Sequence, residues 1–162
     1  MRPHPVSAIR PYRDGDAEAL ATVFERAVRG IAARDYSPAQ IEAWIGPEPR
    51  ADRFGARMAD GRRCWVALDD DDGRVTAFVD LEADGHIDLL FADPEVAGRG
   101  VTSDLLDVLE RTARDEGMSR LYVEASEAAR RFLLKRGYVV ERRRDFEIRG
   151  VAIHNYAMEL RL

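Results

Sequence analysis

The sequence predicts a mixed α/β fold in which helices cover both faces of a central sheet. Segments before residue 60 and after residue 100 carry apolar residues at the three- and four-residue spacing of amphipathic helices. Between them, residues 64–92 alternate apolar and polar side chains, as strands do. The last part of the chain has a strand, helix, strand order, which implies a parallel strand pair. Because 162 residues are enough for one hydrophobic core, we expect a single domain over residues 1–162.

The first third of the chain should form one strand and three helices. We expect the strand at residues 6–12 and a long amphipathic helix after it. The apolar side chains that would face the core from this helix are Leu20, Val23, Phe24, Ala27, Val28 and Ile31. Ser37 and Pro38 are typical of a helix start, so a short helix is expected through Trp44, with another at residues 52–59.

The middle of the chain is predicted to be an antiparallel meander of residues 64–68, 74–82 and 86–92. Asp-Gly pairs at 72–73 and 84–85 favour tight turns between these strands. The later elements are expected to be a helix over 101–117, a strand over 121–125, a helix over 126–136 and closing strands over 138–149 and 151–160.

The charge of the chain excludes several classes of function. Acidic residues outnumber basic ones by 30 to 25, the formal net charge is −5, and the pI is about 5.3. We therefore expect no nucleic-acid partner and no binding to anionic membranes, because both require a positive surface. No apolar run approaches the length of a membrane span or of a signal-peptide core.

Cysteine and histidine usage favours a cytoplasmic protein without a metal. Cys64 is the only cysteine, so no internal disulfide can form and a reducing compartment suits the chain. The three histidines, His4, His86 and His154, do not combine with it in any zinc-binding pattern. We expect cytoplasmic localisation and no metal site.

The most informative segment is residues 91–103, which ends a strand and opens a helix through a glycine-containing loop. Gly98 and Gly100 permit positive φ and a close approach of the backbone to a ligand. The first amides of the following helix lack intrahelical partners, and the helix dipole adds positive charge there. These features favour a diphosphate site. On its own, a glycine before a helix is equally consistent with an ordinary turn.

Two familiar nucleotide-binding loops do not fit this segment. A P-loop requires Lys followed by Ser or Thr after its last glycine, whereas Gly100 is followed by Val101 and Thr102. A dinucleotide fingerprint requires three glycines inside a parallel βαβ unit, whereas an antiparallel meander is expected before this loop.

At this loop the sequence resembles the GNAT superfamily of N-acetyltransferases, whose signature is Gln/Arg-x-x-Gly-x-Gly/Ala after the fourth strand. The resemblance covers nearly the whole chain. Its other parts are Ile9-Arg10-Pro11, the three-strand meander, Asp93-Pro94, and Phe132-Leu133-Leu134-Lys135-Arg136-Gly137-Tyr138. It implies a central, mostly antiparallel, twisted sheet of six to seven strands, with a parallel pair splayed at the acetyl-CoA site.

The resemblance implies that acetyl-CoA is the cosubstrate and that the loop holds its pyrophosphate. The residues it assigns to acetyl-CoA are Phe91, Ala92, Ala97, Gly98, Arg99, Gly100, Val101, Thr102 and Ser103. Ala97 stands where the family has Gln or Arg, and Thr102 replaces the last small residue of the signature. Arg99 supplies a cation there, and the hydroxyls of Thr102 and Ser103 supply hydrogen-bond donors.

Acetyl transfer to an amine needs a donor for the developing oxyanion and an acceptor for the amine proton. In the family the oxyanion donor is a main-chain N–H of the fourth strand, which maps to Phe91 and Ala92. We expect His86 to accept the proton, since its ordinary pKa of about 6.5 suits neutral pH and it maps to a general-base Glu of some members. Asp88, on the same strand face, or Glu82 would orient His86 or receive the proton through water.

Other assignments of these residues stay open. A histidine beside a turn can equally be an ordinary structural residue, and Asp80 and Glu124 are further carboxylates that could serve as base. Many family members protonate the leaving thiolate with a tyrosine, but Leu133 occupies that position here; Tyr122 and Ser126 are the candidates to replace it.

The acceptor is expected to bind a stripe of residues that recur every four positions, Tyr36, Gln40 and Trp44, although such a stripe also suits packing. The leading hypothesis is transfer of the acetyl group of acetyl-CoA to a primary amine of a small molecule or peptide, by direct attack in a ternary complex. The alternative is a catalytically weak acyl-CoA-binding or protein-interaction module, because Ala97, Thr102 and Leu133 depart from the family. The expected partners are acetyl-CoA and the amine acceptor, and the expected state is a monomer or homodimer.

Overall fold

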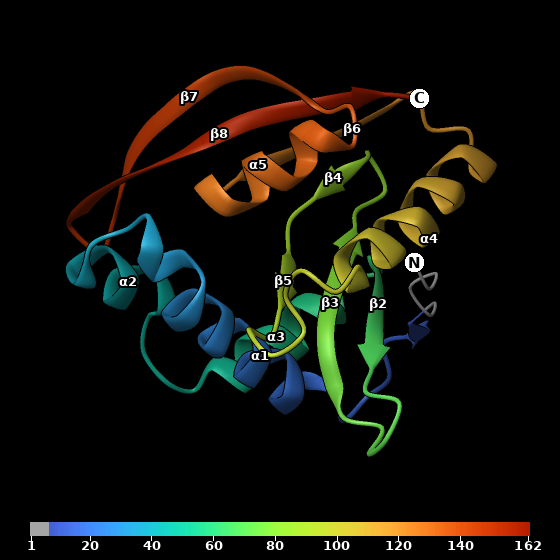
Figure 1. The fold of residues 1–162 in the computed structure, drawn as a ribbon, viewed down its shortest axis with the longest axis horizontal. Helices are drawn as coiled ribbons and strands as arrows, with labels where there is room; N and C mark the ends of the chain where they lie inside the picture. Colours follow the sequence, from blue (N-terminus) through green and yellow to red (C-terminus); the bar gives the residue numbers. More distant parts are fainter. Residues whose placement is uncertain (1–6) are drawn as a thin grey trace.

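The computed structural model describes residues 7–162, so residue 6 of the first expected strand lies outside the described part. The strands form two four-stranded sheets (Figure 1). The first sheet has the order β1 (Ala8–Pro11), β2 (Arg63–Leu68), β3 (Val75–Leu81) and β5 (Leu90–Ala92), all antiparallel. The second has the order β4 (His86–Ile87), β6 (Arg120–Ala125), β8 (Val151–Arg161) and β7 (Val139–Ile148).

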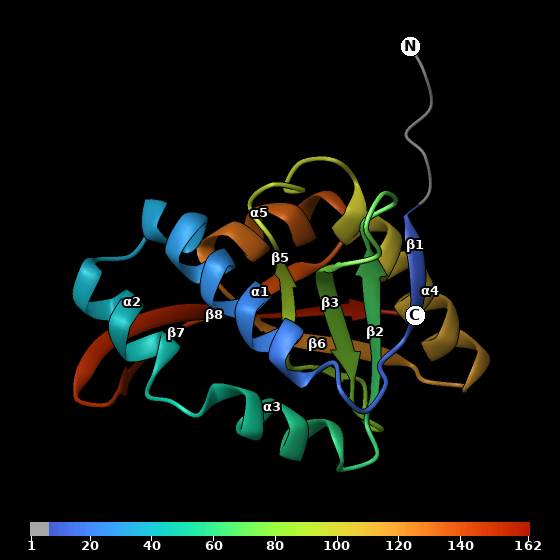
Figure 2. The ribbon, with the colours of Figure 1, turned by 90° about the horizontal axis from the view of Figure 1, so that it is seen from below.

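Helices cover both faces of the first sheet, as predicted. The helices and the short 3₁₀ turn are α1 (Ala17–Gly30), η1 (Ala32–Arg34), α2 (Pro38–Ile45), α3 (Arg50–Met58), α4 (Val101–Asp115) and α5 (Glu127–Lys135). In β2 and β3, alternate side chains serve opposite faces: Val66 and Phe78 pack with α1 and α3, whereas Ala67 and Val79 pack with α4. Figure 2 shows α1 and α4 on either side of β3. The core therefore has two apolar layers with the first sheet between them.

Local sequence signals explain where α2 begins and ends. Ser37 Oγ accepts from Gln40 N at 3.2 Å, and Gln40 Oε1 accepts from Ser37 N at 2.8 Å, which completes a capping box in front of Pro38. The helix ends at Gly46, whose φ of 73° is left-handed and therefore favours glycine. These signals fix the place of α2 beside β8.

The third strand expected in the meander is broken in two, which corrects the sequence prediction. β5 pairs with β3 in antiparallel fashion as expected, but β4 leaves the first sheet and pairs in parallel with β6, where His86 lies opposite Tyr122. The break falls at Asp88 and Leu89, between β4 and β5 at the centre of Figure 1. At this break the chain passes from the second sheet, which contains β4, to the first, which contains β5.

A buried carboxylate holds this break. The fully buried Asp80 accepts hydrogen bonds from Asp88 N at 2.9 Å, from Leu89 N at 2.7 Å and from Arg62 Nη1 at 2.8 Å. Burial raises the pKa of Asp80 to about 6, while Arg62 and the backbone amides oppose that rise. The carboxylate is thus mostly ionised at neutral pH and accepts from the N–H groups of Asp88 and Leu89, which have no backbone acceptor within residues 7–162. No helix between residues 7 and 162 is long and apolar enough to cross a bilayer.

Candidate active site

Two hollows meet beside the strand break. The larger, which we call the large cavity, has a volume of about 480 Å³; the smaller, the apolar groove, has about 240 Å³. Both are lined by Trp44, Leu90, Phe91, Ser126 and Ala129. A ligand in the groove and a second ligand in the cavity would therefore approach each other at β5 and the start of α5.

The apolar groove contains about half of the residues that the resemblance assigns to acetyl-CoA. Phe91, Ala92, Ala97, Gly98 and Thr102 line it. The other four do not line it: Val101 is buried in the core, Arg99 is exposed, Ser103 Oγ accepts from Arg136 Nη1 at 2.7 Å, and Gly100 is the N-cap of α4.

The loop before α4 presents unpaired amides. Gly98 and Gly100 have φ values of 78° and 86°, in the left-handed region that glycine adopts without steric cost. Within residues 7–162, their N–H groups have no acceptor. The first bond within α4 runs from Asp104 N to Gly100 O, so the amides of Val101, Thr102 and Ser103 precede it. Together with the helix dipole, these donors fit an anionic diphosphate.

The open edge of β5 also presents amides to the groove. Bonds from Asp80 N to Leu89 O and from Asp93 N to Thr76 O bracket the pairing of β5 with β3. Because antiparallel pairs alternate, the N–H of Phe91 faces β3, whereas those of Leu90 and Ala92 face away from it. Of the two residues expected to provide the oxyanion donor, Ala92 therefore has its N–H on the groove side, and Phe91 does not.

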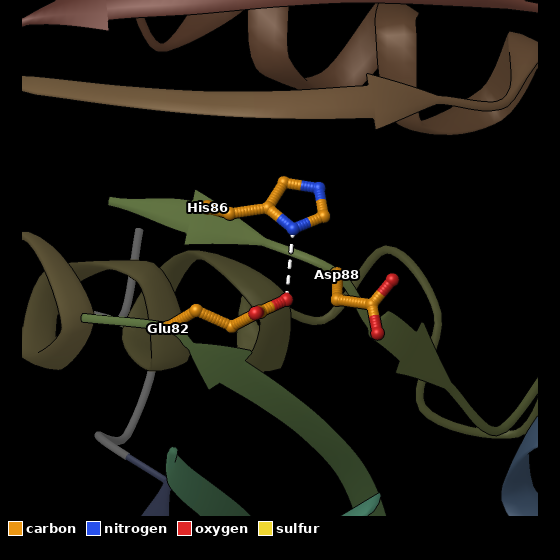
Figure 3. Close-up of side chains that lie close together, drawn as sticks. All are labelled: Glu82, His86 and Asp88. Atoms are coloured by element: carbon orange, nitrogen blue, oxygen red, sulfur yellow. Dashed lines mark hydrogen bonds and ion pairs between the residues drawn. The ribbon is translucent and has the colours of Figure 1, made fainter. Parts of the chain in front are cut away.

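His86 lies between two carboxylates. Its Nδ1 is 2.8 Å from Glu82 Oε1, as Figure 3 shows, and its Nε2 is 2.7 Å from Glu124 Oε2. The ring stacks on Tyr122 with centroids 4.7 Å apart. The hydrogen bond that Glu124 accepts from Nε2 is the main cause that raises the pKa of His86 to about 9. The imidazole is therefore mostly protonated at pH 7, rather than the free base expected from its ordinary pKa.

Glu82 and Asp88 have different roles around this ring. Glu82 contacts His86 directly, whereas Asp88 accepts from Arg62 Nη1 at 2.9 Å. Ligand atoms of Glu82, His86 and Asp88 lie within 4.8 Å of one another, close enough to hold a metal ion (Figure 3). Arg62 also lies 3.7 Å from Glu82, so a guanidinium already provides the positive charge that such a cluster attracts.

The large cavity contains two of the three residues expected to bind the acceptor. Tyr36 and Trp44 line it, with ring centroids 5.6 Å apart. Tyr36 OH donates to His154 O at 3.0 Å and accepts from Glu127 N at 3.2 Å, which ties α5 to β8. Gln40 does not line the cavity: besides capping α2, its Nε2 donates to Ala152 O at 3.0 Å. The capping box explains this use of Gln40.

The structure brings other residues to the cavity. Glu124 lines it while also contacting His86, and Ser126 lines both hollows. From the sequence alone, both residues are only secondary candidates. The alternation of side chains within β6 does not indicate which face of the strand lines a cavity. Leu133 is fully buried, and Tyr122 donates its hydroxyl to Asp84 and lines neither hollow. Ser126 is thus the hydroxyl at the junction of the two hollows.

Comparisons with known proteins identify the family of the chain. Residues 32–160 match a family model described as an acetyltransferase (GNAT) domain. The chain is 34% identical over 150 residues to a protein named uncharacterized N-acetyltransferase YafP from Escherichia coli (strain K12), and the match covers 93% of each chain.

Solved structures show the same fold. One, described as "GCN5-Related N-acetyltransferase: Aminotransferase, Class-II", from Rhodopseudomonas palustris, has a TM-score of 0.92 and 34% identity, covering 100% of this chain and 99% of that one. PaiA N-acetyltransferase from Thermoplasma acidophilum, solved in complex with coenzyme A, has a TM-score of 0.77 and 20% identity, covering 96% and 98%.

Proposed function

The chain belongs to the GNAT family of acetyltransferases, and on this premise we propose that it transfers the acetyl group of acetyl-CoA to a primary amine of a small molecule or peptide, by direct attack in a ternary complex. The observation that carries the proposal is the junction of the apolar groove with the large cavity at Phe91 and Ser126. A thioester in one hollow and an amine in the other would meet there.

The apolar groove is the proposed site of acetyl-CoA. Its apolar walls suit the pantetheine arm, and the free amides around Gly98 and Gly100 suit the diphosphate. The N–H groups of Leu90 and Ala92 are proposed to stabilise the oxyanion that develops on the thioester carbonyl. A structural relative with this fold binds coenzyme A, which supports the assignment.

Glu124 and His86 are proposed to remove the amine proton together. When His86 is neutral, its Nδ1–H donates to Glu82 and its Nε2 is free to accept a proton. Glu124 takes a proton from the ammonium group of the acceptor and passes it to Nε2. The neutral amine then attacks the thioester carbonyl; as the C–S bond breaks, the second nitrogen proton passes to the departing thiolate, to which Ser126 is placed to donate a hydrogen bond. Because the pKa of His86 is raised to about 9, only a minor fraction of the rings is neutral at pH 7. The rate should therefore rise with pH up to that value.

A binding and turnover assay tests the proposal. Coenzyme A and acetyl-CoA should each raise the Tm of the protein, and acetyl-CoA should release free thiol in the presence of primary amines. No Tm shift and no thiol release would overturn the proposal. Stabilisation by coenzyme A without release across a broad amine panel would instead support the alternative, an acyl-CoA-binding module.

A further inference from the structure

The large cavity carries more positive than negative charge. Four guanidinium groups line it, against two carboxylates: Arg53, Arg57, Arg144 and Arg149 against Asp88 and Glu124. The whole chain has a net charge of −5, so this excess of cations is a local property of the cavity. A local positive potential of this kind attracts anionic ligands that the rest of the surface repels.

Three of these arginines lie beyond ion-pair distance of any carboxylate in residues 7–162, although Arg144 is near enough to Glu124 to help His86 lower the pKa of that carboxyl group. Arg57 lies 3.7 Å from Asp88, but Arg53, Arg144 and Arg149 make no ion pair with any group in residues 7–162. Arg53 donates to Ile45 O at 3.5 Å, Arg144 to Asn155 Oδ1 at 2.9 Å, and Arg149 to Ala43 O. Since a guanidinium has five N–H donors, most of their donors stay available to a ligand.

Arg53 and Arg149 converge on one end of the cavity although they come from different elements. Arg53 lies on α3 and Arg149 in the turn between β7 and β8, and both bond to carbonyl oxygens at the end of α2. Arg149 and Gly150 form the two-residue turn of this hairpin and have φ values of 49° and 78°, the positive values that such turns require.

The backbone leaves room for the Arg149 guanidinium. Gly46 has no side chain, and its backbone lies close to this group: a Cβ atom there would be 2.5 Å from Arg149 Nη2. The Arg149 guanidinium thus packs against the end of α2, where it lines the cavity and makes no ion pair within residues 7–162.

The opposite charge lies on another wall of the cavity. Glu124, on β6, is the carboxylate proposed above to receive the amine proton. The lining also includes aromatic side chains, among them Trp44, Phe54 and Phe146. The cavity thus offers an anionic group for an ammonium and paired cations for an anion.

We infer that the acceptor is a small molecule that carries an oxyanion, a carboxylate or a phosphonate, in addition to its amine. Arg53 and Arg149 bind the oxyanion, and Glu124 receives the amine. This inference rests on the proposed function and names the class of its second substrate. An amine without the oxyanion leaves both guanidinium groups without a strong partner and so binds more weakly.

Matched acceptors test this inference. The panel consists of ω-amino acids of increasing chain length, each compared with its own carboxamide, and ω-aminoalkylphosphonates compared with the parent alkylamines. The wild-type protein should use at least one acid with a KM about tenfold or more below that of its neutral partner. The same acid should raise the Tm of the complex with coenzyme A, whereas its carboxamide should not.

Variants assign the effect to the two arginines. Arg53→Gln and Arg149→Gln should each raise the KM for the acid about tenfold and leave the KM for the carboxamide unchanged. Gln and Arg have the same backbone cost at the positive φ of position 149, so the variant and the wild-type protein should be similarly stable. The control is Arg142→Gln, an exposed position on β7 that does not line the cavity, which should change neither KM.

The outcomes separate this inference from the proposed function. Equal or better use of the carboxamides and alkylamines would overturn the inference and leave acetyl transfer intact. If no acid of either series is acetylated or raises the Tm, the inference is likewise overturned. Failure of coenzyme A to bind, with no thiol release from any amine, would instead overturn the proposed function.

Discussion

His86 lies between Glu82 and Glu124, and this position governs when its ring can accept a proton. The two carboxylates favour the protonated ring and set its pKa near 9. Replacing Glu124 by Gln removes the larger stabilising contact, so the pKa of His86 should fall by about 1 to 2 units. NMR titration of the ring protons measures this directly, with the His86→Ala spectrum assigning the signal.

Glu124 and His86, the proposed proton acceptors, determine the pH dependence of the rate. With an acceptor amine that titrates well below pH 8, kcat/KM of the wild-type protein should rise with pH to a limit set by an apparent pKa of about 9. Glu147→Gln, at an exposed position on β7, is the control and should leave this limit in place. A limit near pH 6.5 in the wild-type protein would show that His86 does not work as the paired acceptor.

Ser126 combines a structural role with a proposed chemical one, and two substitutions separate them. Its Oγ accepts from Ala129 N at 3.3 Å as the cap of α5, and within the described chain its own O–H has no acceptor. Ser126→Ala should lower kcat about tenfold and destabilise the fold by about 1 kcal/mol. Ser126→Asn keeps a capping oxygen but lacks the hydroxyl, so kcat should fall while stability holds. Wild-type kcat in the Asn variant would exclude a role for the hydroxyl.

At the scale of elements, the break between β4 and β5 depends on Asp80. Asp80→Asn keeps the size of the side chain but removes the charge that Arg62 and two backbone amides share. We expect a loss of about 3 kcal/mol in the free energy of unfolding, measured in urea, because Arg62 then lacks its buried partner. The kcat should fall as well, since the amides of β5 lose their fixed position.

A second partner of Arg62 provides the control for this substitution. Asp60 is exposed and accepts from Arg62 Nη2 at 2.7 Å, but it does not touch the strand break. Asp60→Asn should therefore change stability far less and leave kcat at the wild-type value. Equal effects of the two substitutions would show that Asp80 acts only through the charge of Arg62.

The loop before α4 can be tested with two glycines that share the same backbone geometry. Gly98 lines the apolar groove and Gly117 follows the far end of α4; both have a φ of 78° and open space at the Cβ position. Gly98→Asp places a carboxylate beside the proposed diphosphate and should weaken coenzyme A binding about tenfold or more, measured by calorimetry. Gly117→Asp introduces the same backbone strain and should not. Equal affinities for coenzyme A in the two variants would place the diphosphate elsewhere.

Across the whole molecule, regular elements followed from periodicity and capping signals, whereas the broken strand did not. The alternation in residues 86–92 is the same whether the segment is one strand or two. The segment is divided by the buried carboxylate of Asp80, which lies on β3 and accepts hydrogen bonds from two backbone amides. The sequence pattern of β3 does not indicate these bonds. Long-range hydrogen bonds of this kind leave no local signal in the sequence.

The candidate site shows the same limit. Gly98 and Thr102 could be assigned from a local motif because a loop and a helix start are local structures. Gln40 shares the spacing of Tyr36 and Trp44 but serves as a cap, and no spacing rule distinguishes the two uses. Arg53 and Arg149, almost a hundred residues apart, meet only through the fold. Their convergence is visible in the structure alone.

A crystal structure of the protein grown with coenzyme A tests the central claim most directly. The account predicts density along the apolar groove, with the diphosphate on the amides of Gly98 to Thr102 and the thiol beside Phe91 and Ser126. A coenzyme bound in another hollow, or a thiol that points away from the large cavity, would contradict it.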